Sequence, residues 1–159
     1  MAKQVYLETT VVSYLTARSS RDLVRAARQQ ITREWWETRR GDFGLYVSQI
    51  VADEAADGDP EAAALRLKEL VGIPRLVISE EATELARELI IQHALPQDAL
   101  EDALHIALAS VHGMDFLLTW NCSHIANAEM MESIRSAVES AGYKCPTICT
   151  PEEMLGDLS

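Results

Sequence analysis

The sequence lacks the features that would place it among membrane, secreted or metal-thiolate proteins. Among its 159 residues no apolar run approaches the length of a membrane-spanning helix, and the N-terminus shows no signal-peptide pattern. Its three cysteines, Cys122, Cys145 and Cys149, are odd in number, and their spacing matches neither a zinc site nor a redox pair. We therefore expect free thiols in a cytoplasmic protein that does not enter a membrane.

The sequence is also poor in positive charge and in common catalytic motifs. It holds 14 basic and 25 acidic residues, which gives a formal net charge of −11. Such a surface repels nucleic acid, so a nucleic-acid role needs a local basic patch, a bound metal ion or both. The same surface attracts basic protein partners. The chain has no glycine-rich phosphate loop and no nucleophile elbow, and its histidines show no metal spacing with cysteine.

What is present is an alternation of strand and helix patterns, which predicts an α/β class with a mainly parallel sheet and one domain over residues 1–159. We predict strands over 4–7, 43–47, 76–78, 116–120 and 146–149, and helices over 11–15, 21–40, 60–71, 80–93, 96–112 and 126–141, with one more after Ser48. The expected helix caps are Ser19 or Ser20, Ser48, Asp59 and Ser79, with a capping box over 150–153.

The most informative stretch runs from residue 95 to residue 121. Pro96 suits the first turn of a helix, and Asp98 and Asp102 follow four residues apart, which places them on one helical face. Both would lie where the helix dipole favours negative charge. Gly113 ends the helix, and a short buried strand then leads to Asn121. The pattern predicts polar side chains at one edge of the sheet.

Two further acids fall at similar places. Glu8 directly follows the first strand, and Glu54 lies on the helix after the second. In open α/β sheets ligands bind beyond the carboxyl ends of strands, so these acids and Asp102 can face one cleft. Gathered carboxylates are the ligands of Mg²⁺ or Mn²⁺. Taken singly, Glu54 fits an exposed residue of a surface helix, and Asp102 fits a first-turn residue that interacts with the helix dipole. The Thr10 hydroxyl either helps to hold a ligand or caps the local backbone.

The segment after the first short helix is the most basic part of the chain. Its arginines are Arg21, Arg25, Arg28, Arg33, Arg39 and Arg40. They form either a solvated helix face or a patch that faces phosphates. His105 fits a packed, hydrogen-bonded histidine better than a catalyst, and the three tryptophans fit the core or an interface better than base stacking.

At this point the motifs resemble the PIN-domain ribonucleases, and among them the VapC-like toxins of bacterial toxin–antitoxin systems. The resemblance lies in VYLETTVVSYL with Glu8 and Thr10, VSQIVADE with Glu54, DALHIALA with Asp102, LLTWN with Asn121, and the ending TICTPEEML. It covers nearly the whole chain. Glutamate stands in place of the family's first aspartate, and Asn121 in place of its fourth acid.

The resemblance implies a three-layer α/β/α sandwich and hydrolysis of RNA phosphodiester bonds with Mg²⁺ or Mn²⁺. It implies Glu8, Glu54 and Asp102 as metal ligands, with Asn121 and Asp98 as supporting ligands or water positioners and Thr10 in support. It also implies a homodimer that a basic antitoxin inhibits. Two other hypotheses stay open: a PIN-like module that has lost catalysis and acts through protein partners, and a different Mg²⁺-dependent α/β phosphohydrolase.

Overall fold

Parallel strands alternate with helices along the chain, as the sequence predicts. The computed structural model describes residues 1–156. The strands are β1 (Lys3–Leu7), β2 (Phe43–Ser48), β3 (Arg75–Leu76), β4 (Phe116–Leu118) and β5 (Thr147–Cys149). The helices are α1 (Thr9–Thr16), α2 (Leu23–Thr38), α3 (Gln49–Ala55), α4 (Pro60–Leu70), α5 (Glu80–Ile91), α6 (Leu100–Val111) and α7 (Met131–Ser140), with 3₁₀ turns η1 (Arg40–Asp42) and η2 (Glu152–Met154).

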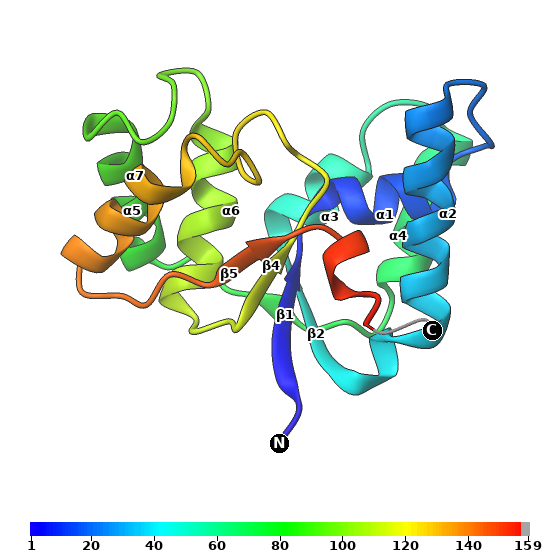
Figure 1. The fold of residues 1–159 in the computed structure, drawn as a ribbon, viewed down its shortest axis with the longest axis horizontal. Coiled ribbons are helices and arrows are strands. Elements are labelled where there is room, and N and C mark those ends of the chain that lie inside the picture. The colour runs from blue at the N-terminus through cyan, green and yellow to red at the C-terminus, as the bar shows by residue number, and fades with distance from the viewer. Residues whose placement is uncertain (157–159) are drawn as a thin grey trace.

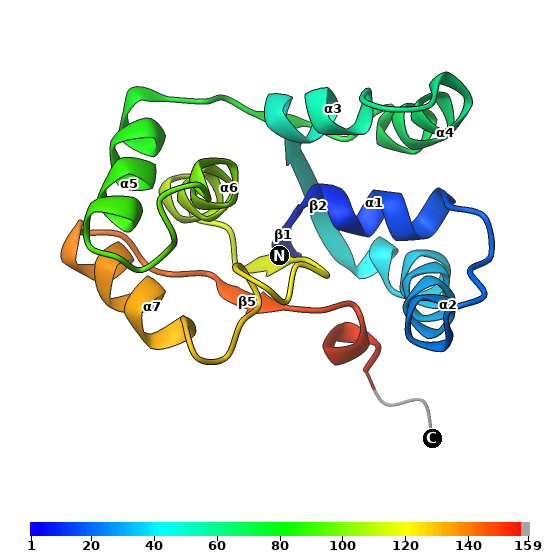
Figure 2. The same cartoon turned by 90° about the horizontal axis from the view of Figure 1, so that it is seen from above.

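The five strands form one sheet in the order β3-β2-β1-β4-β5, and every neighbouring pair is parallel. Helices cover both faces of this sheet (Figure 1). Figure 2 shows α5, α6 and α7 on one side and α1 to α4 on the other. The α/β class and the three-layer architecture are therefore confirmed. Among residues 1–156 no helix is long and apolar enough to cross a membrane.

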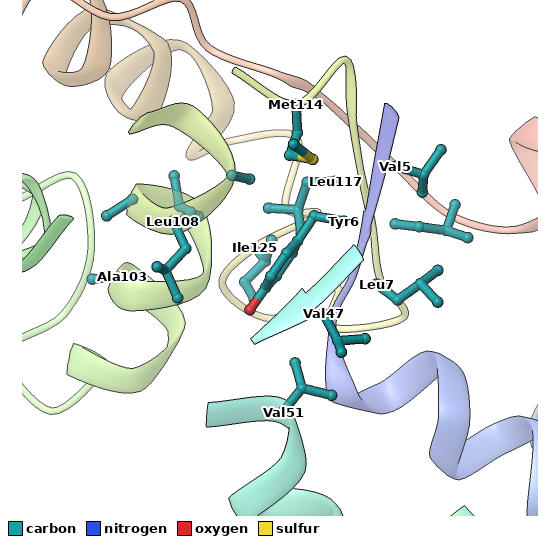
Figure 3. Packing of buried hydrophobic residues seen from close by; sticks show 14 of the residues in the cluster. Val5, Tyr6, Leu7, Val47, Val51, Ala103, Leu108, Met114, Leu117 and Ile125 are labelled. Atoms are coloured by element: carbon teal, nitrogen blue, oxygen red, sulfur yellow. The ribbon is translucent and has the colours of Figure 1, made fainter. Parts of the chain in front are cut away.

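The centre of the sheet is buried on both faces, which fixes where its strands end. Val5, Tyr6 and Leu7 of β1 are at most 2% exposed. Figure 3 shows Tyr6 pointing towards Leu108 and Ile125, while Val5 and Leu7 point the other way. Parallel strands covered on both faces need apolar side chains on both, which explains the apolar run of residues 5–7 at the end of β1. The residue that follows this strand is consequently held by the core.

The predicted start of the helix that carries Asp102 is wrong. Helix α6 begins at Leu100, and its N-cap Ala99 makes no side-chain capping bond. The N–H of Ala99 donates to the carbonyl of Pro96 at 3.0 Å, and this bond closes a turn ahead of the helix. Pro96 and Asp98 therefore lie outside the helix, and Asp98 and Asp102 do not share a helical face.

Other helix ends follow local hydrogen bonds. The predicted caps Ser48, Asp59 and Ser79 are confirmed, each accepting from a backbone N–H in the first turn. The serine cap predicted for α2 is wrong, because Asp22 accepts from the N–H of Arg25 instead. The capping box predicted over 150–153 is not formed, since η2 has no side-chain cap. The region 126–130 forms turns, so α7 is shorter than predicted.

Candidate functional site

Glu8 follows β1 directly, and its carboxylate is buried beside the end of β4. Leu7 pairs with Leu118, so the carboxyl ends of these two parallel strands lie side by side. Glu8 is only 4% exposed. Its Oε1 accepts from the hydroxyls of Thr10 at 2.5 Å and Thr119 at 2.6 Å, and its Oε2 accepts from the N–H of Thr10 at 3.2 Å. Three neutral donors thus hold this carboxylate in place.

The two threonine hydroxyls also tie down the chain after β4. The Thr10 hydroxyl accepts from the N–H of Trp120 at 2.8 Å, and the Thr119 hydroxyl accepts from the N–H of Asn121 at 2.9 Å. Thr10 therefore serves as a local partner of Glu8 and as a link between α1 and the loop after β4. Its hydroxyl is engaged as both donor and acceptor.

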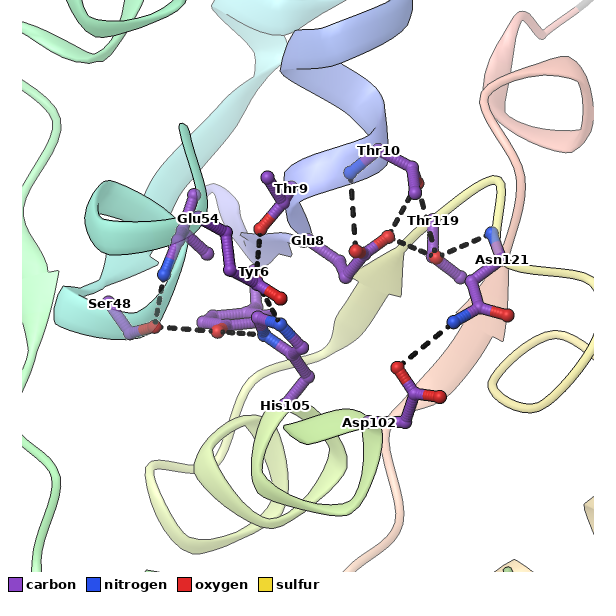
Figure 4. A network of polar contacts seen from close by, with 11 residues as sticks. Tyr6, Glu8, Thr9, Thr10, Ser48, Glu54, Asp102, His105, Thr119 and Asn121 are labelled. Carbon is purple, nitrogen blue, oxygen red and sulfur yellow. Dashed lines mark hydrogen bonds and ion pairs between the residues drawn. The ribbon is translucent and has the colours of Figure 1, made fainter. Parts of the chain in front are cut away.

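Glu54 reaches the same edge of the sheet from α3, which starts directly after β2. Its Oε1 accepts from the hydroxyl of Thr9 at 2.5 Å and bonds to Nε2 of His105 at 2.8 Å. The fully buried His105 ring bonds through Nδ1 to the hydroxyl of Tyr6 at 2.7 Å, and that hydroxyl bonds to Ser48 at 2.8 Å. This network joins β1, β2, α3 and α6 (Figure 4).

The pKa shifts of the Glu54–His105 pair favour the charged forms. Burial lowers the pKa of His105, but the hydrogen bond to Glu54 and the negative charges of Glu8 and Glu54 outweigh burial and raise it overall. Burial likewise opposes ionisation of Glu54, yet the bonds from His105 and Thr9 and the charge of His105 lower the pKa of that carboxyl. At a pH between the lowered pKa of Glu54 and the raised pKa of His105, the pair therefore consists of an imidazolium that faces a carboxylate.

Asp102 is held by two residues from the loop after β4. Its Oδ1 accepts from Nδ2 of Asn121 at 3.1 Å, and its Oδ2 bonds to Nδ1 of His124 at 2.7 Å. The Oδ1 of Asn121 accepts from the N–H of His124 at 3.1 Å. Because one amide atom faces an acceptor and the other a donor, the orientation of the Asn121 amide is fixed. Asn121 lies between Asp102 and the loop, with both amide atoms engaged.

These residues gather around one space, which Figure 4 shows between Glu8, Glu54 and Asp102. One ligand atom each of Glu8, Glu54 and His105 lies within 4.8 Å of the others, and Asp102 is not part of this compact group. Asp102 adds to the negative potential there, since its charge contributes to the raised pKa of His105. Among residues 1–156 no lysine or arginine forms an ion pair with any of these acids.

Two more acids lie close to Asp102 along the chain. Asp98 and Glu101 line, together with Asp102, a shallow hollow of about 390 Å³. The exposed Glu101 side chain hydrogen-bonds to Glu54, and this bond, followed by the charge of Glu54, raises the pKa of Glu101. Two carboxyl groups that share a hydrogen bond show that negative charge is crowded at this point.

The donor set fits a hard divalent cation. An ionised carboxylate offers about four lone-pair sites, and neither Glu8, Glu54 nor Asp102 uses all of its own in the hydrogen bonds described. Ligand carboxylates are commonly oriented by such hydrogen bonds. His105 is engaged through both ring nitrogens, so in this arrangement it positions Glu54.

Four hydroxyl and imidazole residues that bond directly to Glu8, Glu54 or Asp102 lie outside the set predicted from the sequence. They are Thr9, Thr119, His105 and His124. The sequence could have indicated two of these residues from their spacing. Thr119 stands two residues before Asn121, and His105 stands about one helical turn after Asp102. The contacts of Thr9 and His124 depend on how distant segments pack, and no local pattern indicates them.

A parallel five-stranded sheet with acids at its carboxyl edge and helices on both faces defines a layered α/β domain with a candidate site for a cation. The PIN domain family model matches residues 5–121, so the chain belongs to the PIN domain family. The crystal structure of Mycobacterium tuberculosis VapC20, described as a Sarcin-Ricin loop cleaving toxin, is similar with a TM-score of 0.59 and 17% identity, covering 78% of this chain and 95% of that one. At this identity the likeness shows the fold. A search of curated protein sequences gave no match.

Proposed function

We propose that this PIN domain is a Mg²⁺- or Mn²⁺-dependent endoribonuclease that hydrolyses RNA phosphodiester bonds. The observation that supports this proposal is the convergence of Glu8, Glu54 and Asp102, from β1, α3 and α6, on one space without a lysine or arginine partner among residues 1–156. Carboxylates in this arrangement repel one another, and a bound cation relieves that repulsion.

Each acid has its own part in the proposal. Glu8, Glu54 and Asp102 hold the cation directly or through water, with Asp98 and Glu101 adding negative charge at the rim. When bound, such a cation polarises the phosphoryl oxygen and makes an attacking water more acidic. Thr10 and Thr119 fix the Glu8 carboxylate, and His105 fixes that of Glu54. We assign Asn121 a positioning role, because it donates to Asp102 rather than offering a free carbonyl oxygen.

The biological setting of the proposal is a toxin–antitoxin pair. It draws on the PIN family and on the structural likeness to VapC20, a Sarcin-Ricin loop cleaving toxin. We propose a cytoplasmic homodimer of one-domain chains, inhibited by a basic segment of an antitoxin. The charge of −11 and the acidic cluster give a basic segment an electrostatic reason to bind.

The test is metal-dependent stability together with cleavage. Thermal melts of the wild type with and without Mn²⁺ should show stabilisation by the cation, because it binds the folded state. Asp102→Asn keeps the side-chain shape but removes a ligand charge, so the shift should shrink. Cleavage of single-stranded RNA should fall roughly 10²–10³-fold in the variant, as expected for losing one electrostatic stabiliser.

Asp53→Asn is the matched control, since Asp53 is the exposed neighbour of Glu54 and its carboxylate accepts a hydrogen bond from the Gln49 side chain, away from the acidic cluster. It should keep both the Mn²⁺ shift and the cleavage rate. If Asp102→Asn cleaves as fast as the wild type, the nuclease assignment is wrong.

One observation favours a second candidate, a PIN-like module that acts only through protein partners. Asn121 brings no charge to the site, and both of its amide atoms are already bonded. Titration with Mn²⁺ separates the two candidates, because a site without catalytic function should bind the ion weakly or not at all.

A further inference from the structure

Positive charge in this acidic chain is concentrated in one segment. Residues 18–40 hold seven of the 14 basic residues and only three acids, although the whole chain has a net charge of −11. Three of these arginines, Arg25, Arg28 and Arg33, lie on α2, which Figure 1 shows beside α1, and the other four lie just before or after this helix. Helix α1 begins directly after Glu8, so the basic segment packs against the helix that leads away from the acidic cluster.

A groove lies between the end of α1 and the start of α2. It has a volume of about 380 Å³, and its lining includes Ser13, Tyr14, Arg18 and Arg25. We call it the arginine groove. Arg18 and Arg25 are exposed, and within residues 1–156 neither guanidinium has a carboxylate at ion-pair distance. Two cations that no acid neutralises therefore face this groove.

A chain of contacts through Tyr14 and the buried Trp120 links the arginine groove to the acidic cluster. Tyr14, which lines the groove, lies 5.9 Å from the ring of Trp120, and the guanidinium of Arg28 lies 5.2 Å from the same ring. The N–H of Trp120 bonds to Thr10, whose hydroxyl donates to Glu8. Trp120 is anchored to α2 as well, since its indole N–H donates to Thr32 at 2.8 Å.

We propose that the arginine groove binds the phosphodiester backbone of a single-stranded RNA on one side of the bond to be cleaved. The inference rests on the proposed function for the location of that bond. Arg18 and Arg25 would contact phosphates, and the ring of Tyr14 offers a surface on which a base can stack. Arg28, held over the ring of Trp120, adds a third positive charge on α2.

The groove lies along the helix that begins directly after Glu8, and this position decides which polyanion it binds. An occupant that extends from the arginines to Glu8 must place a group at the acidic cluster that a cation can bridge. A phosphate has that property, whereas an acidic peptide gains nothing from reaching a cluster of carboxylates. The groove also gives an acidic protein the local basic patch that RNA binding requires, because phosphate contacts release counterions.

The experiment measures RNA binding without divalent metal, so that it does not depend on cleavage. A fluorescent single-stranded RNA is titrated in EDTA with the wild type and with the double variant Arg18→Gln/Arg25→Gln, at several salt concentrations. Each lost phosphate contact lowers the slope of log affinity against log salt by about 0.7, so the double variant should lose about 1.4 in slope. Its affinity at low salt should fall about tenfold.

Arg87→Gln is the matched control, an exposed arginine on α5, on the other side of the sheet from α2 (Figures 1 and 2). It should bind RNA like the wild type, and thermal melts should show all variants equally folded. Equal slopes for the double variant and the control overturn the proposal, as does failure of the wild type to bind RNA. An oligoglutamate that binds as tightly as RNA of equal charge assigns the groove to an acidic protein segment instead, which also overturns it.

Cleavage assays with Mn²⁺ keep the two proposals apart. If binding depends on Arg18 and Arg25 but no cleavage occurs, the groove is supported and the nuclease assignment fails. If the wild type cleaves RNA and the double variant keeps both its binding slope and its KM, the nuclease assignment is supported and the groove is overturned.

Discussion

The hydroxyl of Thr119, at the end of β4, donates to the buried carboxylate of Glu8, at the end of β1, over 2.6 Å. The two residues are 111 positions apart in the sequence. Parallel pairing of their strands brings them together, and the same hydroxyl accepts from the N–H of Asn121. One threonine therefore orients the carboxylate of Glu8 and the loop that carries Asn121.

Thr119→Val should destabilise the protein and loosen the site. Valine keeps the branched shape but removes one of the two hydroxyl donors to Oε1 of the buried Glu8 and the acceptor of the Asn121 N–H, which costs about 1–3 kcal/mol. Chemical unfolding in EDTA measures this loss, and the Mn²⁺-induced shift in Tm should also shrink. Thr147→Val is the control, since Thr147 is exposed and its hydroxyl makes no hydrogen bond within residues 1–156. An equal loss in both variants would contradict the role of Thr119.

Asn121→Asp should destabilise the metal-free protein and increase its response to Mn²⁺. The new carboxylate would face that of Asp102 where an amide now donates over 3.1 Å, so like charges replace a hydrogen bond. A cation relieves this repulsion, and the added anionic ligand strengthens its binding. Melts over a Mn²⁺ series measure both effects.

The exchange variant Asp102→Asn/Asn121→Asp tests the geometry of this contact. The double variant again pairs one amide with one carboxylate, in swapped positions. Its unfolding free energy without metal should therefore be higher than the value obtained by adding the effects of the two single substitutions. Strict additivity would show that the two side chains do not interact.

The Glu54–His105 pair should give the metal-free protein a stability maximum in mildly acidic solution. The raised pKa of His105 adds stability that is fully present below its ordinary value of 6.5 and is lost as pH rises through the folded value. The lowered pKa of Glu54 adds stability that is present above 4.5 and is lost as pH falls through the folded value. Both contributions therefore coincide between 4.5 and 6.5.

Unfolding of the wild type and of His105→Gln in EDTA checks this dependence. The difference in unfolding free energy should be largest in that window and should decrease at alkaline pH. His112→Gln is the control, because the His112 ring bonds to the carbonyl of Val77 rather than to a carboxylate. A difference for His105→Gln that stays constant across the titration would rule out the charged pair.

Thiol labelling should distinguish the three cysteines, which are all free as predicted from the sequence. Burial raises the pKa of Cys145 to about 11 and that of Cys149 to about 12, whereas Cys122 is exposed. At neutral pH Cys145 has about 100-fold less thiolate than a thiol of pKa 9.0. Iodoacetamide followed by mass spectrometry should modify Cys122 first, with the other two reacting after unfolding. Equally fast modification of Cys145 would contradict its burial.

The sequence predicted much of the fold because its signals are local. Apolar runs such as that of β1 have to be buried on both faces, and Ser48, Asp59 and Ser79 cap the helices that directly follow them. Where a prediction failed, a competing local bond was stronger. Asp22 caps α2 in place of a serine, and the turn from Pro96 to Ala99 delays α6.

The sequence by itself determined the α/β class and the residues that stand at the ends of strands and helices, among them Glu8, Glu54 and Asp102. Only the tertiary structure decided which donor each of these acids meets. Glu8 meets Thr119, Glu54 meets His105, and Asp102 meets His124. These contacts depend on strand register and on how helices and loops pack against the sheet. The physical reason is that a hydrogen bond requires its atoms to lie within about 3 Å. Spacing along a chain cannot fix such a distance between segments that meet only after folding.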